Sequence, residues 1–147
     1  MKTTFRLKVF VDTNVLLDYL VASREMHASA TDLFSIILSS SIEAAFSTQS
    51  ILDISYIGKK YKGFNFDIFR KAMNELLART NVSSIDCFDM RLALQDPEID
   101  LEDNAQIAFA HAQKCDIIVT NDRKLLSRAL PAPMIAMTTE DFLSHCR

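Results

Sequence analysis

The stretch Lys8-Val9-Phe10-Val11-Asp12-Thr13-Asn14-Val15-Leu16-Leu17-Asp18 is an apolar run that ends abruptly on an acid. Residues 8–11 are rich in Val and Phe and are typical of a buried strand, whereas residues 14–20 indicate the opening of a helix. Asp12 is therefore expected at the carboxyl end of a strand. In an open α/β sheet this edge is where ligands bind, because strand ends and helix N-termini converge there.

Short apolar segments alternate with longer helical stretches along the rest of the chain, which predicts an α/β fold with a parallel central sheet. The expected strands are about five, at residues 8–11, 44–47, 82–85, 116–120 and 133–137. Apolar residues at helical spacing predict core-facing helices within residues 28–40 and 66–79, and Thr138 is expected to cap a final helix over 139–145. We expect a doubly wound sheet flanked by helices, in one domain spanning residues 1–147.

The composition argues against several other classes of protein. The chain has 147 residues, 49% of them hydrophobic, and its net charge of −3 does not favour non-specific binding of nucleic acid over a whole face. The cysteines Cys87, Cys115 and Cys146 lack the spacing of a disulfide framework or a zinc site. The sequence has no Gly-rich phosphate loop and no apolar run near the ~18 residues of a membrane span. We therefore expect a cytoplasmic protein without membrane association.

Four acids fall at equivalent places in this pattern. Asp12 and Asp122 each follow a predicted strand, and Asp53 and Asp103 lie near the start of predicted helices. Since strand C-termini and the following helix N-termini share one edge of a parallel sheet, the four side chains are expected to meet there. The remaining acids considered are interpreted as solvated helix or loop charges: Asp18, Asp32, Asp67 and Asp86.

A cluster of carboxylates is unfavourable unless protons or a cation compensate the charge. Mg²⁺ and Mn²⁺ prefer carboxylate and water oxygens, so a divalent metal is the natural partner for this cluster. Any one of the acids alone is better explained as a helix cap than as a metal ligand, because an acid near a helix N-terminus accepts hydrogen bonds from free N–H groups. The placement of all four acids at one edge of the sheet indicates a metal site more strongly than any single acid does.

Four segments together resemble the PIN domain, the fold of the VapC-type toxins of toxin–antitoxin pairs. They are VFVDTNVLLDYL, STQSILDISYI, DLEDNAQIAFAHA and IIVTNDRKL, in that order across the chain. The resemblance implies a metal-dependent endoribonuclease with a parallel central sheet, an RNA substrate, a small antitoxin protein as partner, and self-association. The family's acids match Asp12, Asp53, Asp103 and Asp122, and its small hydroxyl position matches Thr120.

The resemblance also suggests a role for each acid. Asp12 and Asp103 are the expected central ligands of one or two metal ions, and Asp122 is a ligand or a water-mediated contact. Most family members carry a Glu where this chain has the shorter Asp53, so Asp53 is either a direct ligand or an outer partner that holds the attacking water. The candidates for orienting these carboxylates or contacting phosphate are Asn14, Thr120, Asn121, Arg123 and Lys124, with Lys59 and Lys60 as further basic candidates.

Two other functions stay open at this point. A haloacid-dehalogenase-like phosphatase also begins with a strand that ends in Asp, but its second acid two residues later is replaced here by Asn14. The other alternative is a non-catalytic module whose acidic pocket serves binding alone. The four candidate acids favour the nuclease over both.

Overall fold

The computed structural model describes residues 6–39 and 41–146, which form a five-stranded sheet in the order β3-β2-β1-β4-β5. The strands are β1 (Lys8–Val11), β2 (Glu43–Ser47), β3 (Asn81–Ser83), β4 (Ile117–Val119) and β5 (Ile135–Met137). All neighbouring strands are parallel, and Val9 of the central strand is opposite Ala44 on one side and Ile117 on the other. The expected parallel α/β sheet is confirmed.

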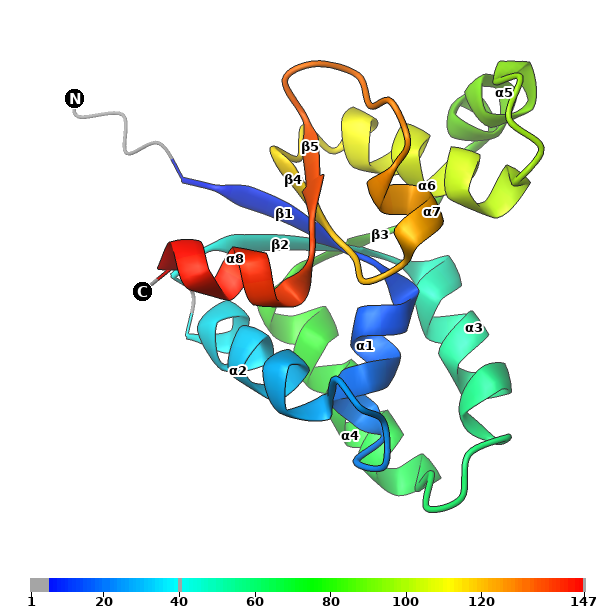
Figure 1. Ribbon diagram of the computed structural model, residues 1–147. Coiled ribbons are helices and arrows are strands. Elements are labelled where there is room, and N and C mark those ends of the chain that lie inside the picture. Colours follow the sequence, from blue (N-terminus) through cyan, green and yellow to red (C-terminus); the bar gives the residue numbers. More distant parts are fainter. Residues whose placement is uncertain (1–5, 40, 147) are drawn as a thin grey trace.

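Helices cover both faces of the sheet (Figure 1). They are α1 (Thr13–Leu20), α2 (His27–Leu38), α3 (Thr48–Gly58), α4 (Phe66–Arg79), α5 (Cys87–Gln95), α6 (Leu101–Ala112), α7 (Arg123–Leu126) and α8 (Thr139–Cys146). Helices α1 to α4 and α8 lie on one side of the sheet, and α6 and α7 lie on the other (Figure 1). The arrangement is doubly wound, as expected.

The alternation of side chains along β1 explains the two layers. Val9 and Val11 point into a core that includes Leu16 and Phe34, whereas Phe10 points into a second core and meets Phe109 of α6 edge-on at 5.7 Å. Because successive side chains of a strand point to opposite faces, an entirely apolar strand requires apolar partners on both sides. This is why the run before Asp12 lies at the centre of the sheet.

Some boundaries differ from the expected ones. The third strand is Asn81–Ser83 instead of residues 82–85, because its half-buried residues lie at the sheet edge and lack the strong apolar pattern of β1. Helix α5, which the sequence did not predict, begins at a reciprocal cap in which Asp86 and Asp89 each accept a hydrogen bond from the other's main-chain N–H. The predicted helix within 28–40 is His27–Leu38, and residue 40 lies outside the described residues.

The final helix agrees with the sequence prediction. It spans Thr139–Cys146, and the Thr138 hydroxyl accepts a hydrogen bond from the main-chain N–H of Asp141 at 3.1 Å, as a cap should. Within the described residues, no helix is both long enough and apolar enough to cross a membrane.

Candidate active site

Asp12 follows β1 directly and is almost completely buried, with 4% of its surface exposed. Its Oδ2 accepts a hydrogen bond from the Thr120 hydroxyl at 2.7 Å, and the Thr120 oxygen in turn accepts one from the Asp122 main-chain N–H at 3.1 Å. Its main-chain N–H donates to the carbonyl of Val119 at 3.0 Å. These contacts tie the end of β1 to the end of β4 and fix the carboxylate of Asp12 between them.

The electrostatic environment opposes the charge on Asp12. Burial is the main cause that raises the pKa of Asp12 from its ordinary 3.8 to about 6, and the negative charges of Asp103 and Asp122 add to the increase. The hydrogen bonds from Thr120 and the Thr13 main chain act in the opposite direction, but they do not outweigh burial. A buried carboxylate faced by two further acids is expected to attract a proton or a cation.

Asp103 and Asp122 complete this group of acids. Burial raises the pKa of Asp103, and the charges of Asp100 and Asp122 raise it further, whereas the cations of Arg128 and Lys124 lower it. Asp122 caps α7, since its Oδ1 accepts a hydrogen bond from the Lys124 main-chain N–H at 3.0 Å. The sequence predicts that Asp12, Asp53, Asp103 and Asp122 meet at the carboxyl edge of the sheet. The charges of Asp12, Asp103 and Asp122 act on one another, whereas Asp53 is not among the charges that raise the pKa of Asp12 or Asp103.

Asp53 lies on α3, at one side of this group. Its Oδ1 accepts a hydrogen bond from the Gln49 amide at 2.8 Å. Burial is the main cause that raises the pKa of Glu102, and the charge of Asp53 is the second. The charges of Asp100 and Asp103 raise this pKa further. Asp53 is therefore coupled most directly to Glu102 on α6.

The acids match a divalent metal in chemistry but do not form a closed ligand shell. Their donors are all carboxylate oxygens, which suit Mg²⁺ or Mn²⁺, and burial together with the neighbouring acids raises the pKa of Asp12. Nevertheless, within residues 6–39 and 41–146 no three acid, histidine or cysteine side chains converge closely enough to hold a metal ion. Holding one would require these carboxylates to turn toward a shared point.

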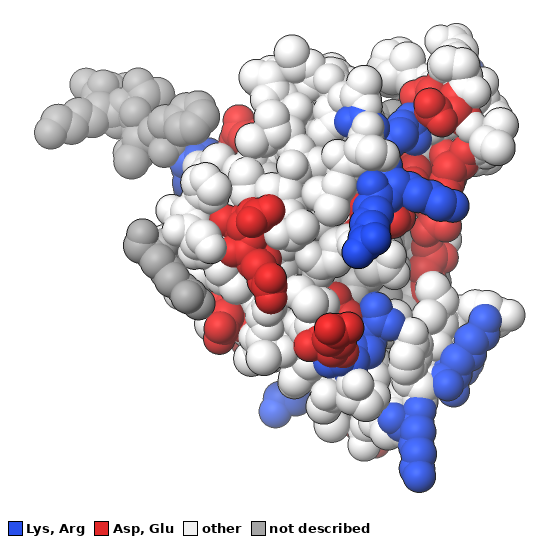
Figure 2. Space-filling model, in the orientation of Figure 1, with Lys and Arg blue, Asp and Glu red and all other residues white. Residues whose placement is uncertain are grey.

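Basic side chains border the acids. Figure 2 shows Lys and Arg side chains over the region of α7, immediately beside acidic ones. Arg123 and Lys124 are exposed at the start of this helix, and Lys124 and Arg128 line a cavity of about 320 Å³ together with Asp103. Glu98 and Asp100 also line this cavity, and Arg128 is paired with Asp96 at 3.1 Å, so the exposed Arg123 and Lys124 are the better candidates to contact an anionic ligand.

The comparison with known proteins identifies the fold. The family model of the PIN domain matches residues 8–124. The chain belongs to the PIN domain family.

Relatives of this PIN domain include ribonucleases. "Ribonuclease VapC1" of Aquifex aeolicus is 26% identical over 143 residues, 92% of each chain. The crystal structure of Mycobacterium tuberculosis VapC20, a Sarcin-Ricin loop cleaving toxin, superposes with a TM-score of 0.63 at 14% identity over 80% of this chain and 92% of that one. VapBC2 from Rickettsia felis, bound to a DNA fragment from its promoter, gives a TM-score of 0.62 at 14% identity, covering 90% and 98%. At such identities the structural likeness concerns the fold.

The predicted substrate-contacting residues of this PIN domain have different surroundings. Thr120 is fully buried and its hydroxyl is bonded to Asp12, which favours the orienting role over contact with phosphate. Asn14 is exposed and lines a cavity of about 420 Å³ that also reaches Asp122. Lys59 and Lys60 lie at the far end of α3, an 11-residue helix about 16 Å long, and so at a distance from the acids.

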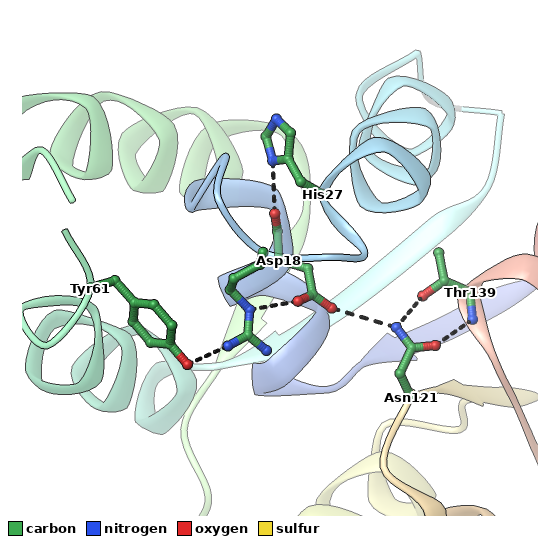
Figure 3. Close-up of polar contacts among 6 residues, drawn as sticks. Asp18, His27, Tyr61, Asn121 and Thr139 are labelled. Carbon is green, nitrogen blue, oxygen red and sulfur yellow. Dashed lines mark hydrogen bonds and ion pairs between the residues drawn. The ribbon is translucent and has the colours of Figure 1, made fainter. Parts of the chain in front are cut away.

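Asp18 contradicts the interpretation as a solvated charge. Only 3% of the residue is exposed, and its Oδ1 accepts a hydrogen bond from Nε of Arg24 at 2.6 Å (Figure 3). Arg24 also donates to the hydroxyl of Tyr61 at 2.5 Å, and His27 Nδ1 is 2.8 Å from the Asp18 carbonyl. The helical spacing offered a signal, because Asp18 falls three residues after the buried Val15 and so shares its face of α1.

The same network reaches the segment that carries Asp122. The Asn121 amide donates to Thr139 Oγ1 at 3.1 Å and more weakly to Asp18 Oδ2 at 3.5 Å, while its carbonyl accepts from the Thr139 main-chain N–H at 3.1 Å (Figure 3). Asn121 therefore joins α1, the end of β4 and the start of α8. Its amide is committed to the fold, and the position of its neighbour Asp122 depends on it.

Proposed function

We propose that this chain is a metal-dependent endoribonuclease that cleaves RNA phosphodiester bonds, as the toxin of a toxin–antitoxin pair. The observation that carries the proposal is the buried Asp12, whose pKa is raised to about 6 by burial and by the neighbouring acids Asp103 and Asp122. Membership of the PIN domain family and the likeness to a VapC ribonuclease support it. Asp122 also caps α7, but no ion pair offsets the charges of Asp12 and Asp103 within the described residues.

In this proposal Asp12 and Asp103 hold the metal, and Asp122 binds it directly or through water. Bound Mg²⁺ or Mn²⁺ would lower the pKa of a water molecule and offset the charge that develops on the phosphodiester. Thr120 keeps the Asp12 carboxylate in one orientation through its 2.7 Å hydrogen bond. Such outer contacts commonly hold metal ligands in place.

Other side chains would handle the substrate. Asp53, which accepts a hydrogen bond from Gln49 through Oδ1, would hold the attacking water through its other carboxylate oxygen. Lys124, whose charge lowers the pKa of Asp103, and the exposed Arg123 would contact the RNA phosphates, whereas Arg128 is already paired with Asp96. Asn14 would contact the backbone from the cavity beside Asp122.

Two partners follow from the same proposal. A VapBC complex from Rickettsia felis is among the structural neighbours, which supports an antitoxin partner for this chain. Large apolar side chains are exposed on α3 and α4, including Leu52 and Ile68, and on α5, including Phe88 and Leu94. Exposed apolar surface of this kind is typical of protein interfaces and suits both an antitoxin and a second copy of the chain.

All three cysteines are free, in keeping with action in a reducing cytoplasm.

The test is cleavage of a mixture of structured RNAs, tRNA included, with Mg²⁺ or Mn²⁺. Asp12→Asn should lower the rate by on the order of 10²-fold or more, since a lost metal ligand removes several kcal/mol of transition-state stabilisation. EDTA should abolish cleavage. Asp53→Asn should lower the cleavage rate less than Asp12→Asn does if Asp53 acts only through water. Asp32→Asn, on the exposed side of α2, serves as the matched control. Cleavage that survives Asp12→Asn would refute the assignment, and metal binding without cleavage of any RNA would favour the binding module.

A further inference from the structure

A second cavity opens beside Asp53, with a volume of about 480 Å³. It lies between α3, α5 and α6, and its walls differ in character. Ser47, Ser50 and Gln106 form a polar wall, while the apolar residues include Ile85, Met90 and Leu101. A concave site that combines apolar side chains with a few polar groups is typical of sites for small ligands.

Gln106 is the polar residue of this cavity that the proposed cleavage chemistry does not use. It lies three residues after Asp103 and is 5% exposed. Its Nε2 donates to Thr13 Oγ1 over a long 3.4 Å, whereas its Oε1 is buried without a hydrogen-bond partner among the described residues. A buried acceptor without a donor is costly, so this atom is expected to meet an N–H group in a complex.

Hydroxyl groups behind Gln106 connect the cavity to the active site. The hydroxyls of Thr13 and Ser50 are 2.8 Å apart, and those of Ser50 and Ser47 are 3.1 Å apart. Thr13 directly follows Asp12 in the chain. A ligand held by Gln106 would therefore lie next to the candidate cleavage site.

The charges of the cavity indicate which part of a nucleotide it accepts. Asp53 and Glu102 are its charged lining residues in the described part of the chain, so a phosphate would be repelled. The separate cavity beside α7 contains the cations of Lys124 and Arg128 together with the acids Glu98, Asp100 and Asp103, so a phosphate would meet a positive charge there. The uncharged base is the part that fits here.

The hydrogen-bonding groups narrow the choice among bases. The carboxylates and Gln106 Oε1 are acceptors, and the Gln49 amide already donates to Asp53. Adenine, cytosine and guanine carry an exocyclic amino group that can donate to such acceptors. Uracil offers only its ring N3–H, which lies between two carbonyl oxygens that the acceptors of this cavity would repel. Ile85 and Met90 can pack against the base, since unstacked RNA bases are commonly held between side chains and read at their edges.

We propose that this cavity holds a base adjacent to the scissile phosphate and that Gln106 selects bases with an exocyclic amino group over uracil. The proposal rests on the proposed ribonuclease function and adds a specificity site to it. Gln106 reads the base and takes no part in the cleavage step.

The first test compares the cleavage sites of the wild type and Gln106→Met in an RNA of randomised sequence. Met has a similar length and lacks the acceptor, so folding should survive. The wild type should disfavour uracil on the order of 10-fold at one position beside the cut, as expected for one base-edge hydrogen bond, and Gln106→Met should lose this preference. Gln95→Leu, at an exposed position at the end of α5, is the control for loss of an amide elsewhere. An unchanged preference in Gln106→Met would overturn the proposal.

The second test does not depend on cleavage. In EDTA, NMR of the wild type with adenosine, cytidine, guanosine or uridine should show the largest shift of the Gln106 side-chain amide with the three amino-bearing nucleosides. The response to those three should disappear at the neighbouring Ser50 and Met90 in Gln106→Met. Equal chemical-shift changes with all four nucleosides, or no change with any of them, would overturn the proposal. A chain that binds these nucleosides but cleaves no RNA would contradict the proposed function and leave the base site supported.

Discussion

Replacing Asp12 by Asn should make the metal-free protein more stable while it removes the proposed activity. The two side chains have nearly the same shape, and the amide oxygen of Asn can still accept the hydrogen bond from the Thr120 hydroxyl that Asp12 accepts at 2.7 Å. The substitution removes the negative charge that burial and the neighbouring acids disfavour. Packing is preserved, so the change in stability reports the electrostatics of the site.

The magnitude follows from the pKa of Asp12, which burial raises from 3.8 to about 6. One unit of pKa corresponds to about 1.4 kcal/mol, so ionised Asp12 should lower the free energy of unfolding by about 3 kcal/mol. Between pH 3.8 and about 6 the folded protein keeps a proton that the unfolded chain has lost, so stability falls as pH rises through this range. Above about pH 6 Asp12 is ionised in both states, and the full loss of stability is present.

The measurement is urea unfolding of both proteins in EDTA, at about pH 4 and about pH 8. At the higher pH, Asp12→Asn should be more stable by up to about 3 kcal/mol, and at the lower pH the two should be similar. Asp32→Asn removes a charge from an exposed position on α2 and should not reproduce this difference. An Asp12→Asn protein that is no more stable at pH 8, or equally stabilised at both pH values, would refute the electrostatic reasoning.

Three further predictions concern the metal, the buried ion pair and self-association. Mg²⁺ should raise the unfolding temperature of the wild type in a thermal-shift assay, because it binds only the folded state, and an equal response in an Asp12→Asn, Asp103→Asn double variant would rule out these ligands. Arg24→Met should lower the free energy of unfolding, measured with urea, by about 3 kcal/mol or more, because it leaves the Asp18 carboxylate buried and unpaired. Adding Asp18→Leu to the same chain should restore much of the lost stability. If neither loss nor recovery occurs, the pair is not important for stability. The exposed apolar surface should cause self-association, which size-exclusion chromatography with light scattering would detect. A strictly monomeric species at micromolar concentration would contradict this prediction.

The sequence predicted the parts of the fold that depend on local pattern. The run before Asp12 is apolar on both faces and therefore had to be a central strand, and the acid after it had to lie at the carboxyl edge. The same reasoning placed Asp103 and Asp122 at that edge, in agreement with their couplings to Asp12. Parallel topology turns equivalent sequence positions into neighbours, and this is why residues about a hundred apart could be grouped without a structure.

Helix α5 shows where a local pattern fails. Phe88 and Leu94 are apolar yet 62% and 69% exposed, so hydrophobic residues along this helix do not mark a buried face. Its start is instead fixed by the reciprocal cap between Asp86 and Asp89. Apolar residues outside the core remove the periodicity on which helix prediction rests.

Asp12 and Asp18 show why burial of an acid had to be seen in the structure to be interpreted. Both are buried on the same short segment, but Asp18 is paired with Arg24, six residues later, and is reached by Asn121 from the other end of the chain. The charges acting on Asp12 are instead those of Asp103 and Asp122, which oppose its ionisation. Charge compensation within the fold gives Asp18 a structural role, whereas the folded state is expected to become more stable if a cation binds beside the uncompensated Asp12. The sequence distinguished Asp12 by its place after a strand, and the spacing from Val15 offered a sign that Asp18 is buried. It did not show which of the two charges is paired, because that depends on contacts formed in the fold.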